Sequence, residues 1–179
     1  MDREAIVDLI EHKHQAMIDW CNEHGPFYWT YGPHGKWTTA QHIVHLVQST
    51  KPLNKALSVP KLALKMKFGK ANRPSRKYEE VVKRYQEKLK DAIGLVSPFS
   101  KEMPDPTLNE MDEWLEKLTK GKDAQISLIK KKWKEKDLDV CLIPHPLMGR
   151  MLVREILMWS AYHTEHHLNL IKSRAKEMS

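Results

Sequence analysis

Two histidines near the C-terminus, His163 and His167, have the side-chain type and the spacing of metal ligands. Residues four apart on a helix lie on one face, one turn apart. A helix from 152 to 174 would place the pair on an apolar stripe that faces the core, together with Leu152, Ile156, Trp159 and Leu170. Buried imidazoles need partners for their ring nitrogens, and a divalent ion would satisfy one nitrogen on each. The spacing therefore indicates a metal site.

A structural role for the same pair stays open at this point. The chain has ten histidines, so pairs four apart also arise by chance, and histidines on apolar faces are often hydrogen-bonded core residues. Glu165 lies two residues from each histidine and should point away from them. The His-Glu-x-x-His order of zinc proteases is absent. The pair alone does not decide between metal ligands and core histidines.

Length and composition predict one soluble, globular domain covering residues 1–179. The chain is 41% hydrophobic and 30% charged, which is typical of a folded rather than a disordered protein. It has no apolar run resembling a signal peptide or a membrane span, so we expect a cytoplasmic protein without a membrane partner. Its two cysteines, Cys21 and Cys141, are isolated, which argues against a disulfide framework or a cysteine-rich zinc site.

The net charge of +7 is concentrated in two basic runs. Residues 61–77 contain seven basic residues and no acidic one, and a second run surrounds Trp133 within 130–136. Nucleic acids could bind to such patches. Charge runs are more often solvated surface, however, so we expect no nucleic-acid partner and keep a basic nucleic-acid-binding protein as the weakest alternative.

Apolar residues recur at helical spacing through most of the chain. They predict long helices at 2–24, 38–58, 107–137 and 150–176, and a shorter charged helix at 77–92. Gly25-Pro26 should end the first helix, and Thr38 and Thr107 each open a capping box with Gln41 and Glu110. No long alternating strand pattern is visible. The expected fold is therefore all-α, a four-helix bundle with an accessory helix in the connection between the second and third long helices.

The second long helix offers His42 and His45 as further ligands. A helical wheel centred on the apolar residues Ile43, Leu46 and Val47 places His45 on the opposite side, so periodicity predicts a surface residue. A bundle can nevertheless build a site from side chains on facing helices. Spacing alone therefore leaves the third ligand open.

Two segments resemble the signatures of the DinB-like (damage-inducible, YfiT-like) family. The first runs from Trp37-Thr38 through Gln41 to His45-Leu46, and the second from Pro146-x-x-Gly149 to His163-x-x-x-His167. Their order and spacing agree with the family pattern, and the resemblance covers roughly residues 5 to 175.

The resemblance implies a four-helix bundle that holds one divalent metal ion by three histidines. Matched position by position, these ligands are His45, His163 and His167, whereas His42, His166 and His145 are not expected to ligate. The metal could be Zn, Ni, Fe or Mn.

Three histidines without a carboxylate would leave a coordination position for water or substrate. Such a metal lowers the pKa of bound water or of a thiol. The resemblance also implies an activity of one of two kinds. One is metal-dependent transfer or isomerisation that uses low-molecular-weight thiols, and the other is hydrolysis. No catalytic residue can be named; Gln41 and Gln48 are candidates for hydrogen bonds near the site. We expect substrate to approach beside the aromatic loop Phe27–Trp37.

The sequence leaves three functions open. The preferred one is a metal-dependent enzyme acting on a small molecule, such as a thiol S-transferase or a hydrolase, in a chain that could form a homodimer. The second is a metal-binding protein without catalysis, used in sensing or stress response. The third is the nucleic-acid-binding protein, in which the histidines are structural.

Overall fold

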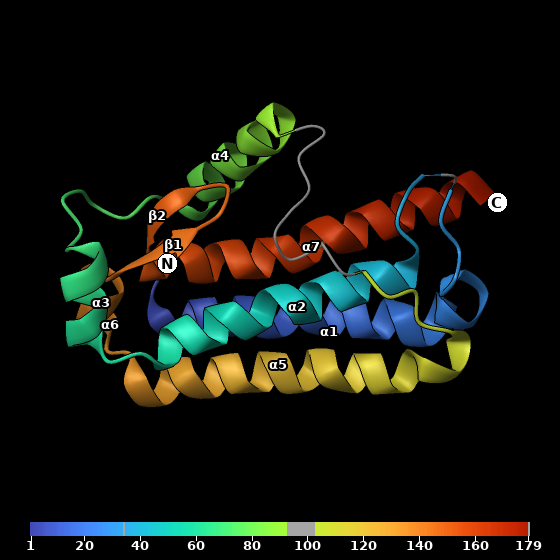
Figure 1. Cartoon of the computed structure of the whole chain (residues 1–179), viewed down its shortest axis with the longest axis horizontal. Helices are drawn as coiled ribbons and strands as arrows, with labels where there is room; N and C mark the ends of the chain where they lie inside the picture. The colour runs from blue at the N-terminus through green and yellow to red at the C-terminus, as the bar shows by residue number, and fades with distance from the viewer. Residues whose placement is uncertain (34, 93–102, 179) are drawn as a thin grey trace.

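Four long helices form the body of the protein in the computed structural model, which describes residues 1–33, 35–92 and 103–178. They are α1 (Arg3–Tyr28), α2 (Thr39–Ser58), α5 (Met111–Lys132) and α7 (Val153–Met178). Helices α1 and α2 each pack against both α5 and α7, so the four enclose one interior (Figure 1). The expected all-α four-helix bundle is confirmed. Among the described residues, no helix is both long and apolar enough to cross a membrane.

The connection between α2 and α5 carries the expected accessory helix, α4 (Tyr78–Asp91). This helix packs against α7 and stands outside the bundle (Figure 1). Smaller elements are α3 (Lys61–Phe68), the 3-10 helix η2 (Leu108–Glu110), α6 (Glu135–Leu138) and the strands β1 (Leu142–His145) and β2 (Gly149–Leu152). Helices α3 and α6 and the hairpin gather at the end of the bundle where α7 begins (Figure 1).

The first helix does not end at residue 24 as expected, because Gly25 and Pro26 lie inside α1. The backbone N–H of Trp29 still reaches the Gly25 carbonyl, at 2.7 Å, so the helix continues past the proline. A Cβ at Gly25 would lie 2.7 Å from the sulfur of Met111. The glycine therefore serves the close approach of two segments rather than helix termination.

The last helix begins at Val153 rather than near Arg150, because residues 149–152 pair with residues 142–145 as an antiparallel hairpin. Gly149 has φ +74°, a left-handed conformation that glycine adopts without steric cost. The third long helix also ends earlier than the predicted residue 137, at Lys132, and the separate short helix α6 follows it.

A polar layer crosses the middle of the bundle between two apolar clusters. One cluster receives Ile10, Leu57, Ile129 and Ile156 from the four helices, and the other receives Met17, Ile43, Leu118 and Leu168. Buried polar side chains lie between these positions on every helix: His14, His45, Ser49, Thr50, Lys122, Gln125, Ser160, His163, Thr164 and His167. Buried polar groups are costly unless they find partners, so this layer is the natural place to look for a functional site.

The capping box at Thr38 fixes the start of α2. Its side chain accepts from the Gln41 N–H at 3.1 Å and donates to Asp105 at 2.9 Å. We expect Thr38→Ala to lower the free energy of unfolding by about 1–2 kcal/mol, the usual loss for an N-cap. Urea unfolding would measure it, with the exposed Thr30→Ala as the matched control. Equal stabilities of the two variants would contradict this role.

Candidate metal centre

Three histidine side chains of the polar layer converge on one point. His45, His163 and His167 are 7%, 5% and 5% exposed. The Nε2 atom of His163 lies 3.2 Å from Nε2 of His45 and 3.1 Å from Nε2 of His167. Nitrogens bound to one zinc-like ion at about 2.0–2.1 Å lie no more than about 4.2 Å apart, so these separations fit a shared ion. Within the described parts of the chain, no carboxylate or cysteine joins this cluster.

Burial keeps these three imidazoles neutral. Desolvation lowers the pKa of His45 to about 4, and it lowers the pKa values of His163 and His167 well below the ordinary 6.5. Neighbouring histidines add to the shift, since each would repel a second positive charge. Neutral imidazole is the form that binds a metal ion, so the cluster is ready to ligate at neutral pH.

The antiparallel packing of α2 and α7 brings the ligand set together. His42 contacts His167 and His45 contacts His163, so residue numbers rise on one helix as they fall on the other. Helix α2 packs against both α5 and α7, which buries two of its faces. The helical wheel identified only the apolar face of α2 as buried and missed the second, polar face. The prediction that His45 lies at the surface is therefore wrong.

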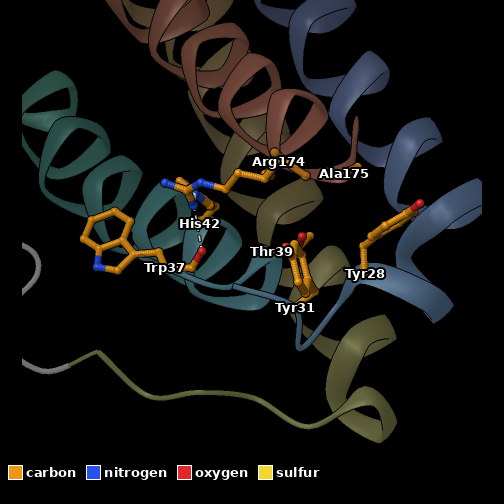
Figure 2. Close-up of a pocket in the computed structure, with 8 residues that line it drawn as sticks. Tyr28, Tyr31, Trp37, Thr39, His42, Arg174 and Ala175 are labelled. Carbon is orange, nitrogen blue, oxygen red and sulfur yellow. Dashed lines mark hydrogen bonds between the residues drawn. The ribbon is translucent and has the colours of Figure 1, made fainter. Parts of the chain in front are cut away.

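His42 lies behind the cluster and contacts it through one ligand. Its Nδ1 is 2.7 Å from Nδ1 of His167, and its Nε2 lies 2.5 Å from the Arg174 guanidinium. To bind a metal ion through Nε2, a neutral His167 must carry its proton on Nδ1, and it donates that proton to Nδ1 of His42. The same guanidinium donates to the Trp37 carbonyl at 2.7 Å (Figure 2). Arg174 and His42 therefore fix the orientation of the His167 ring.

His145 and His166 lie outside the cluster. The Nδ1 atom of His145 accepts from the backbone N–H groups of Leu147 and Met148, at 3.1 and 3.0 Å, and so closes the β1–β2 turn. The His166 ring is half-buried, with its centroid 6.0 Å from that of Tyr85 on α4. The His166 ring also lies 5.3 Å from that of His167, but neither His145 nor His166 belongs to the group of converging nitrogens.

Aromatic side chains surround the three rings. The indole of Trp159 stacks on His163 with centroids 4.7 Å apart, and Trp37 lies 5.0 Å from His45. Tyr85 approaches His163 edge-on at 6.1 Å. Sequence reasoning did not single out Tyr85, although Val81 and Tyr85 are four apart and form the buried face of an otherwise charged helix.

Of the two glutamines expected near the site, Gln41 behaves differently from that expectation. The Gln41 amide oxygen accepts from the backbone N–H of Thr38 at 3.0 Å, so Gln41 caps the helix rather than reaching toward the histidines. Gln48 is half-buried on α2. Gln41 is therefore a helix-capping residue.

Besides a narrow hollow beside His163 that cannot hold a water molecule, two hollows lie along the α2–α7 contact on either side of the three rings. One lies against the aromatic loop, lined by Tyr28, Tyr31, Trp37, His42 and Arg174, and is too narrow to hold a water molecule (Figure 2). The other is an apolar cavity of about 400 Å³ between α2, α3, β1 and α7. Ser49 and Trp159 line it, one helical turn from His45 and His163 respectively. The larger space therefore lies on the side away from the aromatic loop.

Comparison with known proteins identifies a family but no individual relative. Residues 6–171 match the family model described as the DinB superfamily. No curated protein and no solved structure matches the chain.

The three converging rings predict one metal-binding site per chain. We expect His45→Ala, His163→Ala and His167→Ala each to remove most zinc or cobalt binding, because two imidazoles hold a divalent ion poorly. His42→Ala should weaken binding about 10- to 100-fold by releasing His167. Elemental analysis and competition titration would measure this, with His166→Ala and the exposed His12→Ala as controls. Full metal occupancy in His45→Ala together with loss of metal in His166→Ala would refute the assignment of the three ligands.

Buried neutral histidines also predict how stability changes with pH. Burial lowers the pKa of His14 in the folded protein to about 4, against 6.5 in the unfolded chain. Below pH 6.5 the unfolded chain binds more protons, so stability falls as the pH drops from 7 to 5, by about 2 kcal/mol for such a histidine. Urea unfolding with a chelator should show that His14→Gln reduces this fall and that His12→Gln does not. An unchanged fall in His14→Gln would contradict a neutral His14.

Proposed function

We propose that this chain, which belongs to the DinB superfamily, is a metal-dependent enzyme that acts on a small molecule. The observation that supports this most directly is the convergence of three neutral imidazole nitrogens without a fourth ligand among the described residues. A site with three protein ligands leaves room for water or substrate, as catalytic metal sites do. Thiol transfer and hydrolysis are the two reaction classes that suit it.

A divalent ion held by these histidines would lower the pKa of a bound water or thiol, or polarise a bound carbonyl. The chain's own residues prepare the site for that chemistry. His42 and Arg174 orient His167, while Trp37 and Trp159 keep bulk water from the imidazoles. Burial raises the pKa of the Tyr85 hydroxyl, so Tyr85 stays protonated at neutral pH and does not serve as a general base.

The apolar cavity is the better place for a substrate. Its volume of about 400 Å³ falls within the usual range for ligand pockets. Leu53, Ala56 and Ile156 provide apolar walls, and Lys55 and Lys67 also line it. We propose that the apolar part of the substrate lies there, with its reactive group directed along Ser49 and Trp159 toward the histidines. Approach beside the aromatic loop would require Trp37 or Tyr31 to move, because that hollow is closed. The space beside Ser49, Trp159 and His163 is equally narrow, so side chains must also move for a substrate in the apolar cavity to reach the histidines.

A metal-binding protein without catalysis is the second candidate. The low exposure of the three histidines favours it, because a catalytic ion must reach its substrate. The nucleic-acid alternative loses support, since Arg73 and Arg76 of the basic run are both paired with Glu155.

We expect activity in a panel of thiol-transfer and ester or amide hydrolysis assays to disappear with a chelator and return with a divalent ion. His163→Ala should abolish the activity, because it removes a ligand, and the exposed His12→Ala should retain it. Initial rates with and without added metal would measure both effects. Activity in metal-free His163→Ala would refute the proposal that the chain is a metal-dependent enzyme. Tight metal binding with no activity across the panel would favour the sensing role.

The cavity assignment has a separate test. Ala56→Trp would fill the cavity beside α2, which none of His45, His163 and His167 lines, so KM should rise at least about tenfold while metal content stays unchanged. Lys51→Trp, at an exposed position on the same helix, is the matched control. An unchanged KM in Ala56→Trp would show that the substrate binds elsewhere.

A further inference from the structure

A second cavity, separate from the metal centre, lies where the segment 69–77 and α4 meet the hairpin and the start of α7. It has a volume of about 350 Å³. Four arginines line it, Arg73, Arg76, Arg84 and Arg150, together with one acidic residue, Glu155. Glu155 precedes His163 by eight residues on α7, or about 12 Å along the helix axis.

Glu155 is fully engaged by two of the four arginines. Its buried carboxylate accepts two bonds from the Arg73 guanidinium, at 2.5 and 2.7 Å. It also accepts from the backbone N–H of Arg76 at 2.9 Å and from the Arg76 guanidinium at 3.3 Å. These arginines hold the carboxylate ionised and keep its pKa low, although burial alone would raise it. Glu155 therefore has little capacity left to neutralise further positive charge.

Among the described residues, Arg84 and Arg150 have no carboxylate partner. In the part of the chain that the structure describes, neither forms an ion pair, and Arg150 donates only to the carbonyl oxygen of Phe68, at 3.2 Å. Four guanidinium groups and one carboxylate leave the cavity lining with three net positive charges. Like charges that share one cavity repel each other, and a bound anion would relieve that repulsion.

We propose that this cavity binds a small molecule through a phosphate group. Guanidinium groups present planar pairs of N–H donors that match phosphate oxygens, and a phosphate monoester carries about two negative charges at neutral pH. That charge matches Arg84 and Arg150, the two lining arginines that pair with no carboxylate among the described residues. The cavity is larger than a phosphate alone, so it has room for the rest of a small molecule, although its lining is mostly polar.

The test titrates the metal-free chain, kept in a chelator, with inorganic phosphate and with glycerol phosphate at constant ionic strength. Calorimetry and thermal unfolding should show saturable binding, tighter for the monoester. The double variant Arg84→Gln/Arg150→Gln should lose at least about tenfold in affinity for each. Without ligand, its melting temperature should equal or exceed that of the original chain, because its charge repulsion is smaller.

A matched control separates specific binding from net charge. Lys83→Gln/Lys90→Gln removes the same charge from exposed positions on α4 and should bind phosphate like the original chain. Equal affinities in the two double variants would overturn the proposal, as would stabilisation that follows ionic strength alone. An oligonucleotide that binds more tightly than glycerol phosphate and competes with it would also overturn the small-molecule assignment.

Discussion

The burial of three imidazole rings against one another is the constraint on which this structure depends. His45, His163 and His167 lie in the middle of a bundle interior, where an unsatisfied polar nitrogen is costly. Their Nε2 atoms face each other at 3.1 and 3.2 Å, and a neutral imidazole has one donor for its two ring nitrogens. A shared divalent ion satisfies all three nitrogens at once, which hydrogen bonds among the rings cannot do. The arrangement is therefore best explained as a ligand set.

The surrounding fold holds this ligand set in place. The N-cap at Thr38 sets where α2 begins, and antiparallel packing then matches His42 and His45 to the histidines of α7. Arg174 links the aromatic loop to His42, so the end of α7 and the start of α2 are held together around the His167 ring. At the other end, the Glu155 carboxylate ties the segment before α4 to the first turn of α7. Charged hydrogen bonds thus hold both ends of α7 in addition to apolar packing.

Sequence reasoning succeeded where a feature depends on local periodicity. The four long helices and the α7 histidine pair follow from apolar spacing, because each helix buries one stripe. Periodicity failed for His45, because α2 packs against two neighbours and buries a second, polar face that only the family resemblance indicated. The hairpin was missed because strands of four residues, one with Pro144, show no measurable alternation. Tyr85 and Arg174 reach the site through tertiary packing, which no local spacing encodes.

X-ray absorption spectroscopy of the zinc-loaded chain tests the central claim most directly, because it reports which atoms surround the metal without requiring any activity. We expect three imidazole nitrogens at about 2.0–2.1 Å and a further light-atom ligand, with no sulfur. In His45→Ala the imidazole contribution should fall to two. A spectrum with one imidazole or none, or with sulfur ligation from Cys21 or Cys141, would contradict it.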